Sequence, residues 1–72
     1  MNNSIMAKIQ LNGKKISIKS KETIYDLLKK LKLDNRKVAI EHNGVIIPKM
    51  SYKKKYLKSN DKLEVVHFIG GG

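Results

Sequence analysis

The chain has 72 residues, no cysteine, and a formal net charge of +10 from 16 Lys and Arg against 6 Asp and Glu. This length suits one domain, and the lack of cysteine excludes disulfides, thiolate metal clusters, and persulfide or thioester chemistry on its own side chains. No stretch approaches the roughly 20 apolar residues of a membrane span, and the first five residues do not resemble a signal peptide. Residues 1–6 are predicted to be a disordered extension of a single domain that spans 1–72.

Two segments of alternating polar and apolar residues, 8–11 and 15–19, predict half-buried strands. Asn12 and Gly13 lie between them, and because both tolerate positive φ they predict a hairpin turn. The side chains expected to share the core face of this hairpin are Ile9, Leu11, Ile16 and Ile18.

The hydrophobic period then changes to that of a helix, which we predict from about Thr23 to Leu31. Thr23 suits the N-cap position, and Asp26 suits the positive end of the helix dipole. The apolar stripe expected to pack on the sheet consists of Ile24, Leu27, Leu28 and Leu31.

The second half of the chain predicts three more strands, at 38–42, 45–47 and 63–68. Asn43-Gly44 is a second hairpin signal, Pro48 ends the strand before it, and Asn60 suits a left-handed turn. Residues 50–57 are expected to be irregular with a short helical turn. This order predicts an α+β fold of the β-grasp (ubiquitin-like) type, a mixed sheet of about five strands packed on one helix. The last strand is expected beside the first, in the middle of the sheet.

Side-chain chemistry is sparse. His42 and His67 lie in strand patterns, and we interpret both as ordinary strand residues. The six acids are scattered without paired spacing, and the chain contains neither a catalytic triad pattern nor a glycine-rich phosphate loop. The sequence therefore indicates a protein with no catalytic or metal-binding residues of its own, and argues against a self-contained enzyme.

The chain closes on Gly70, Gly71 and Gly72, directly after an apolar strand pattern. Glycine lacks Cβ, so such a segment could enter a narrow channel in another protein. We predict that residues 69–72 form a flexible tail and that the carboxylate of Gly72 is the reactive group. The competing interpretation is a frayed end without function, which is weakened because a complete small-domain pattern ends just before the tail.

Together these features resemble the ThiS family, the sulfur carrier proteins of thiamine (thiazole) biosynthesis. The matching segments are 10–13, 23–28, 39–48 and 61–72. The last of these, which ends in the glycines, is the most specific. Two positions depart from the family pattern: Lys49 stands where arginine is frequent after the proline, and Asn60 where glycine is frequent before the aspartate.

The resemblance implies that a ThiF-like adenylating enzyme uses ATP and Mg²⁺ to form an acyl-adenylate at Gly72. Sulfur from a cysteine desulfurase then displaces AMP and leaves a thiocarboxylate, which donates sulfur to a ThiG-like thiazole synthase. ATP and the metal belong to the partner, so this chain itself binds no cofactor. Gly70, Gly71 and Gly72 would enter the partner's active site, and Phe68 and Ile69 would contact its surface. The resemblance also implies a cytoplasmic protein.

Three alternatives remain open from the sequence. The first is a carrier like MoaD, which supplies sulfur to molybdopterin, and the second is a protein-conjugating ubiquitin-like modifier. The third is a basic β-grasp module that binds RNA. Fifteen of the sixteen basic residues are lysine, and aromatic residues are few. Because phosphate and base recognition favour arginine and stacking aromatics, this composition favours solvation or partner steering over nucleic-acid binding.

Overall fold

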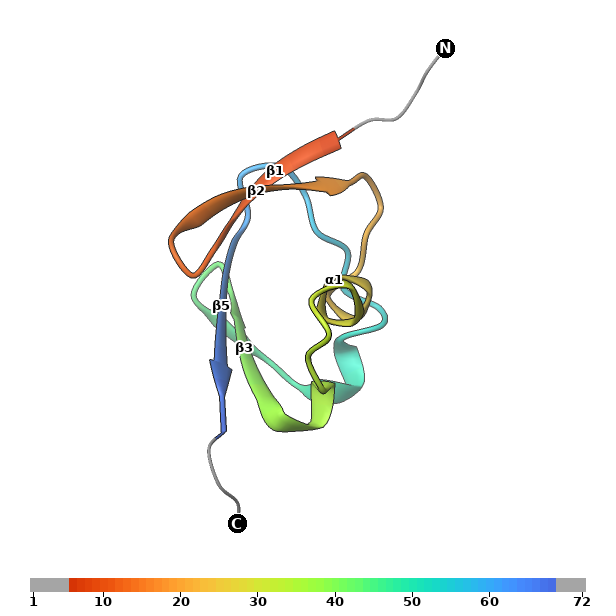
Figure 1. Ribbon diagram of the computed structural model, residues 1–72, viewed down its shortest axis with the longest axis vertical. Coiled ribbons are helices and arrows are strands. Elements are labelled where there is room, and N and C mark those ends of the chain that lie inside the picture. The colour runs from red at the N-terminus through yellow and green to blue at the C-terminus, as the bar shows by residue number, and fades with distance from the viewer. Residues whose placement is uncertain (1–5, 69–72) are drawn as a thin grey trace.

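The computed structural model describes residues 6–68, which form a five-stranded mixed sheet packed on one α-helix. The elements are β1 (Met6–Leu11), β2 (Lys14–Lys19), α1 (Ile24–Lys30), the 3-10 turn η1 (Asn35–Lys37), β3 (Val38–His42), β4 (Val45–Ile47), the 3-10 turn η2 (Lys49–Ser51) and β5 (Lys62–His67). The strand order is β2-β1-β5-β3-β4, with β5 parallel to β1 and antiparallel to β3. Figure 1 shows the sheet curving around α1. The predicted α+β arrangement is confirmed, and so is the last strand beside the first.

Both hairpins turn as their sequences predict. Asn12 and Gly13 have φ of 49° and 83°, and Asn43 and Gly44 have φ of 52° and 86°. Two successive residues at positive φ match the right-handed twist of the flanking strands. Asn60 also lies in the left-handed region, with φ of 72°. The predicted end of β4 before Pro48 is also confirmed.

The first strand begins earlier than the sequence suggested. Met6 belongs to β1 and pairs with Lys19, so the predicted extension over residues 1–6 is wrong at Met6. A single exposed methionine at the end of a strand does not extend the alternating pattern clearly. Met6 belongs to β1 because β2, the neighbouring strand, extends to Lys19 and pairs with it. Residues 1–5 lie outside the described part of the chain. η1, which the sequence analysis did not anticipate, precedes β3 and is capped by the Asp34 side chain.

The N-terminus of α1 is held by a capping box. The Thr23 hydroxyl accepts a hydrogen bond from the Asp26 N–H at 3.0 Å, and the Thr23 N–H donates to Asp26 Oδ2 at 3.1 Å. The backbone hydrogen bond from Thr23, followed by its side chain, holds the pKa of Asp26 below its ordinary value. The expected cap is therefore confirmed.

The C-terminus of α1 differs from the prediction at Leu31, which is 40% exposed. Lys32 adopts φ of 60°, and the Lys32 N–H donates to the Lys29 carbonyl while the Leu33 N–H donates to the Leu28 carbonyl. This pair of bonds is the Schellman pattern, which reverses the chain. The reversal carries Leu33 back onto the core, where it is half-buried, and turns Leu31 toward solvent.

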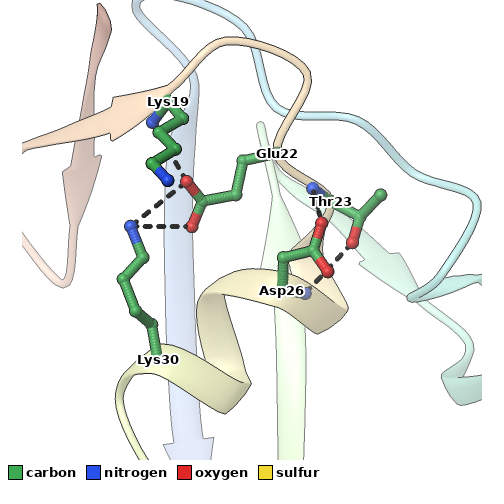
Figure 2. A network of polar contacts seen from close by, with 5 residues as sticks. All are labelled: Lys19, Glu22, Thr23, Asp26 and Lys30. Carbon is green, nitrogen blue, oxygen red and sulfur yellow. Dashed lines mark hydrogen bonds and ion pairs between the residues drawn. The ribbon is translucent and has the colours of Figure 1, made fainter.

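Glu22 joins the end of β2 to the last turn of α1 (Figure 2). Its carboxylate is 5% exposed. Oε1 accepts hydrogen bonds from the Lys19 N–H at 3.0 Å and from Lys30 Nζ at 3.2 Å, and Oε2 lies 3.1 Å from Lys30 Nζ. A buried carboxylate needs such partners, and here they fix how the helix crosses the hairpin.

The core lies between α1 and the concave face of the sheet. Its buried side chains come from every strand and from the helix, together with two residues of the segment after β4. They are Ala7, Ile9, Ile18, Ile24, Leu27, Leu28, Val38, Ile40, Ile47, Tyr52, Leu57 and Leu63. Tyr52 is 1% exposed, so the segment predicted as irregular contributes the largest buried side chain.

We predict that Leu27→Ala or Leu28→Ala lowers the free energy of unfolding by about 2–5 kcal/mol, because each deletes a fully buried side chain. Leu31→Ala is the matched control within the same helix, and its loss should be below about 1 kcal/mol because Leu31 is largely solvated. Urea denaturation followed by circular dichroism measures all three. Equal losses at Leu28 and Leu31 would contradict the burial that the structure assigns.

Candidate functional site

The end of β5 leads to the part of the chain that the sequence analysis singled out. The Phe68 N–H donates to the Lys37 carbonyl at 2.9 Å, and His67 pairs with Val38. The central strand is therefore attached to the start of β3 as far as Phe68. Ile69, Gly70, Gly71 and Gly72, which the sequence analysis assigned to the tail and to partner contact, lie outside the described residues.

Phe68 is 55% exposed, and Lys49 supports its ring from one side. Lys49 Nζ lies 5.3 Å from the ring centroid and donates to the Arg36 carbonyl at 2.9 Å. The two contacts hold the ammonium group against the aromatic face, an attractive cation–π geometry. Lys49 is one of the two departures from the family pattern. In the structure it contacts Phe68, the last described residue.

An apolar strip adjoins Phe68 on the outer face of the sheet, the face that points away from α1. The apolar strip consists of Ala39, Ile46, Val66 and Phe68. Val66 pairs with Ala39 across β3 and β5 and is 58% exposed. Ile46, on β4, is 73% exposed. Exposed apolar side chains that gather on one face are typical of a protein-contact surface.

The structure brings His42 and Asp61 together, which the sequence analysis missed. His42 Nε2 lies 2.7 Å from Asp61 Oδ2, and the two residues are each 7% exposed. His42 is a residue of β3, as expected, and it also has a carboxylate neighbour that the sequence did not indicate. The two residues are 19 positions apart, and only the pairing of β3 with β5 places them in contact. His67 is an exposed residue of β5, as expected.

Asp61 is the centre of a polar network that ties the β3–β4 turn to the loop before β5. Its carboxylate also accepts hydrogen bonds from the Lys58 N–H at 2.8 Å and from Asn43 Nδ2 at 3.1 Å. Burial raises the pKa of Asp61, but the hydrogen bonds from His42, Lys58 and Asn43 outweigh it and hold the pKa below its ordinary value. All the oxygen contacts are internal, which indicates a structural role for this pair.

The described residues contain little that could perform chemistry unaided. Within residues 6–68, no group of three or more His, Cys, Asp or Glu side chains is arranged to hold a metal ion. The helix in this range is too short and too polar to cross a membrane. What the arrangement does offer is an outer face with an apolar strip, next to the point from which the glycine segment continues.

The model of the ThiS family matches residues 3–72. The chain belongs to the ThiS family. The sulfur carrier protein ThiS of Bacillus subtilis is 45% identical over 65 residues, which cover 89% of this chain and 98% of that relative. The match to the ThiS family extends through the glycine segment, where the resemblance in the sequence was most specific.

Two further proteins are similar to this ThiS-family chain. A thiazole synthase of Paramagnetospirillum magneticum is 45% identical over 65 residues, covering 90% of this chain, but the chain spans only 20% of that relative's length. The crystal structure of the thiamine biosynthesis protein ThiS from Geobacter metallireducens matches with a TM-score of 0.75 and 28% identity, over 90% of this chain and 99% of that one. The β-grasp fold is thus shared with a solved member of the family.

We predict that Asp61→Asn lowers the free energy of unfolding at neutral pH by about 1–3 kcal/mol, because it removes a buried charged acceptor of three hydrogen bonds. Since folding lowers the pKa of Asp61, its contribution is complete above the ordinary aspartate value of about 3.9 and is lost as pH falls through the folded value. Urea denaturation between pH 7 and pH 2 should therefore show a shallower acid decline for the variant.

Glu64→Gln is the control for this measurement, since Glu64 is exposed and makes no ion pair within residues 6–68. We expect it to keep the acid decline of the unsubstituted protein. If Asp61→Asn and the unsubstituted protein decline in parallel, Asp61 does not carry the acid sensitivity of the fold.

Proposed function

We propose that this chain, as a ThiS-family sulfur carrier of thiamine biosynthesis, carries sulfur as a thiocarboxylate on Gly72. The observation that carries the proposal is the family match through the glycine segment up to residue 72. The proposal requires Gly72 to be the last residue of the working protein.

Activation of Gly72 needs a partner, because a carboxylate is a poor electrophile. In the proposed reaction a carboxylate oxygen attacks the α-phosphorus of ATP, pyrophosphate leaves, and an acyl-adenylate forms in the active site of a ThiF-like enzyme with Mg²⁺. The terminal sulfur of a persulfide formed by a cysteine desulfurase then attacks the acyl carbon and AMP leaves. A thiol reductant cleaves the resulting acyl disulfide, which releases the thiocarboxylate. ATP and Mg²⁺ are held by the partner, so this chain is a co-substrate and not an enzyme. We also propose that these ATP-dependent reactions take place in the cytoplasm.

We propose a ThiG-like thiazole synthase as the protein that takes the sulfur. The support is the similarity of this chain to part of a thiazole synthase of Paramagnetospirillum magneticum. The matched region makes up 20% of the length of that protein. A region like this one within a thiazole synthase gives the carrier and the acceptor the proximity that sulfur transfer needs. Two relatives are named thiazole synthase, which makes thiazole the favoured acceptor.

The glycines supply access, and the residues before them supply contact. Gly70, Gly71 and Gly72 lack side chains that would obstruct a narrow channel. Phe68, Ile69 and the rest of the apolar strip would lie against the rim of that channel. Exposed aromatic side chains are frequent anchors of protein interfaces, and Phe68 is already oriented by Lys49.

We predict that incubation with ATP, Mg²⁺, the cognate adenylating enzyme and a sulfur source converts the protein to a species in which sulfur replaces one oxygen. Intact mass spectrometry would detect the mass increase, and fragmentation should locate it at Gly72. An unchanged mass in the presence of a demonstrably active cognate enzyme would sink the proposal.

Deletion of Gly71 and Gly72 is the control for this reaction. The shortened protein should form no adenylate, and its unfolding transition should match that of the full chain because the buried core residues of the described range 6–68 lie between Ala7 and Leu63. Retention of activity in the shortened protein would show that Gly72 is not the reactive residue.

We predict that Phe68→Ser raises the KM of the adenylation reaction about fivefold or more and leaves kcat nearly unchanged, because it removes an interface anchor but not the reacting group. Tyr56→Ser is the matched control, since Tyr56 is also 55% exposed but pairs with Thr23 at the start of α1, on the side of the sheet opposite the outer face. Steady-state release of pyrophosphate measures both constants. A KM that is equally unaffected in both variants would exclude Phe68 from the contact.

A further inference from the structure

The outer face of the sheet has a basic end as well as an apolar one. Gln10 of β1 pairs with Lys15 of β2 on one side and with Lys62 of β5 on the other. Lys8 lies two residues before Gln10 on the same face of β1, and all three lysines are exposed. We call Lys8, Lys15 and Lys62 the lysine patch. They surround a shallow hollow of about 400 Å³ that also includes Gln10 and Asn60.

The lysine patch is an unbalanced charge cluster. Within residues 6–68, none of its three ammonium groups makes an ion pair or a side-chain hydrogen bond. No two of these lysines are direct cross-strand partners, but like charges gathered around one hollow repel one another, so the cluster calls for an explanation.

Protection of a free sheet edge explains only part of the patch. Lysines on an edge strand discourage pairing with another sheet, and Lys15 lies on the edge strand β2. Lys8 and Lys62, however, lie on β1 and β5, which have partners on both sides. Their charges protect no edge. General solvation would not require the lysines to gather on one face, whereas a surface complementary to an anionic partner would.

Two glutamates separate the lysine patch from the apolar strip. Glu41 and Glu64 face each other directly across β3 and β5, and neither makes an ion pair within the described residues. From β2 to the end of β5, the outer face thus presents lysines, then two glutamates, then apolar side chains. A partner that covers this face must carry its acidic residues opposite the lysines.

We propose that an acidic segment of the adenylating enzyme docks on the lysine patch while the apolar strip and the tail engage its active-site rim. This inference rests on the proposed function. A protein partner is favoured over RNA because the patch contains no arginine and no aromatic side chain for stacking. It also shares one face with the apolar strip. Complementary charge of this kind raises the association rate and fixes the orientation of docking.

The test compares two triple variants with equal changes of charge. The first, Lys8→Glu with Lys15→Glu and Lys62→Glu, reverses the lysine patch. The second reverses three exposed lysines in turns around α1 and η2, namely Lys21, Lys32 and Lys54. Pyrophosphate release by the cognate adenylating enzyme is followed over a range of carrier concentrations and salt concentrations, with circular dichroism to confirm the fold.

Reversal of the patch should raise KM about tenfold or more at low salt and leave kcat unchanged, because steered association depends on opposite charges. The control triple should change KM less than about threefold. Salt should raise the KM of the unsubstituted protein and leave that of the patch variant almost constant. If the glutamates prevent folding, the corresponding triple Lys→Gln variant should show a smaller rise in KM with the same loss of salt dependence.

Three results would overturn the inference. Equal rises in KM for the two triples would show that overall charge matters and not the patch, and no rise in either would show that the patch is not a docking site. Binding of single-stranded RNA at physiological salt that is lost in the patch variant, with KM unaffected, would assign the patch to nucleic acid. Failure of the proposed function can be distinguished from failure of this inference. If the proposed function is wrong, the unsubstituted protein forms no adenylate at any concentration.

Discussion

The insertion of β5 between β1 and β3 is the interaction on which the rest of this structure depends. β5 is parallel to β1 at Gln10 and Leu11 and antiparallel to β3 along its whole length. Leu63, at its start, is fully buried beneath α1. A strand from the end of the chain thus joins the two hairpins into one sheet. The same pairing fixes where Phe68 lies, and with it the point from which the glycine segment continues.

The two hairpin turns hold this central strand through their asparagine side chains. The Asn12 side chain accepts from the Val65 N–H at 2.7 Å and donates to the Val65 carbonyl at 3.2 Å. Asn43 accepts from the Lys62 N–H at 2.8 Å and donates to Asp61. Each asparagine therefore adopts the positive φ that its turn requires. Its side chain also bonds backbone groups of β5, as a neighbouring strand would. The buried contact between His42 and Asp61 reinforces the second of these attachments.

Polar groups that are buried in a domain of this size must be fully hydrogen-bonded, because desolvation of a charge is expensive. The Asp61 carboxylate meets this requirement with three donors. Glu22 Oε1 meets it with Lys19 and Lys30, whereas the buried Oε2 has only the ion-pair contact with Lys30 Nζ at 3.1 Å. Glu22 joins the end of β2 to the helix that follows it, and Asp61 joins the β3–β4 turn to the loop before β5. The interior therefore uses its acids for assembly, while the outer face, with its lysines and apolar side chains, is left for contact with other proteins.

The sequence alone determined the elements whose signals are local. Each asparagine–glycine pair specified a turn, Thr23 and Asp26 specified the start of the helix, and Pro48 ended β4. The β-grasp order and the family followed from these elements and from the glycine segment. Such features could be predicted because backbone preferences and hydrogen bonds between near neighbours decide them.

The tertiary structure decided what depends on strand pairing and chain reversal. Leu31 turned to solvent because Lys32 took a left-handed conformation that no local residue preference specified. His42 met Asp61, and Lys62 joined Lys8 and Lys15 on one face, because residues far apart in sequence became neighbours when β5 entered the sheet. The sequence shows how many lysines there are, but only the register of the strands shows which of them lie together.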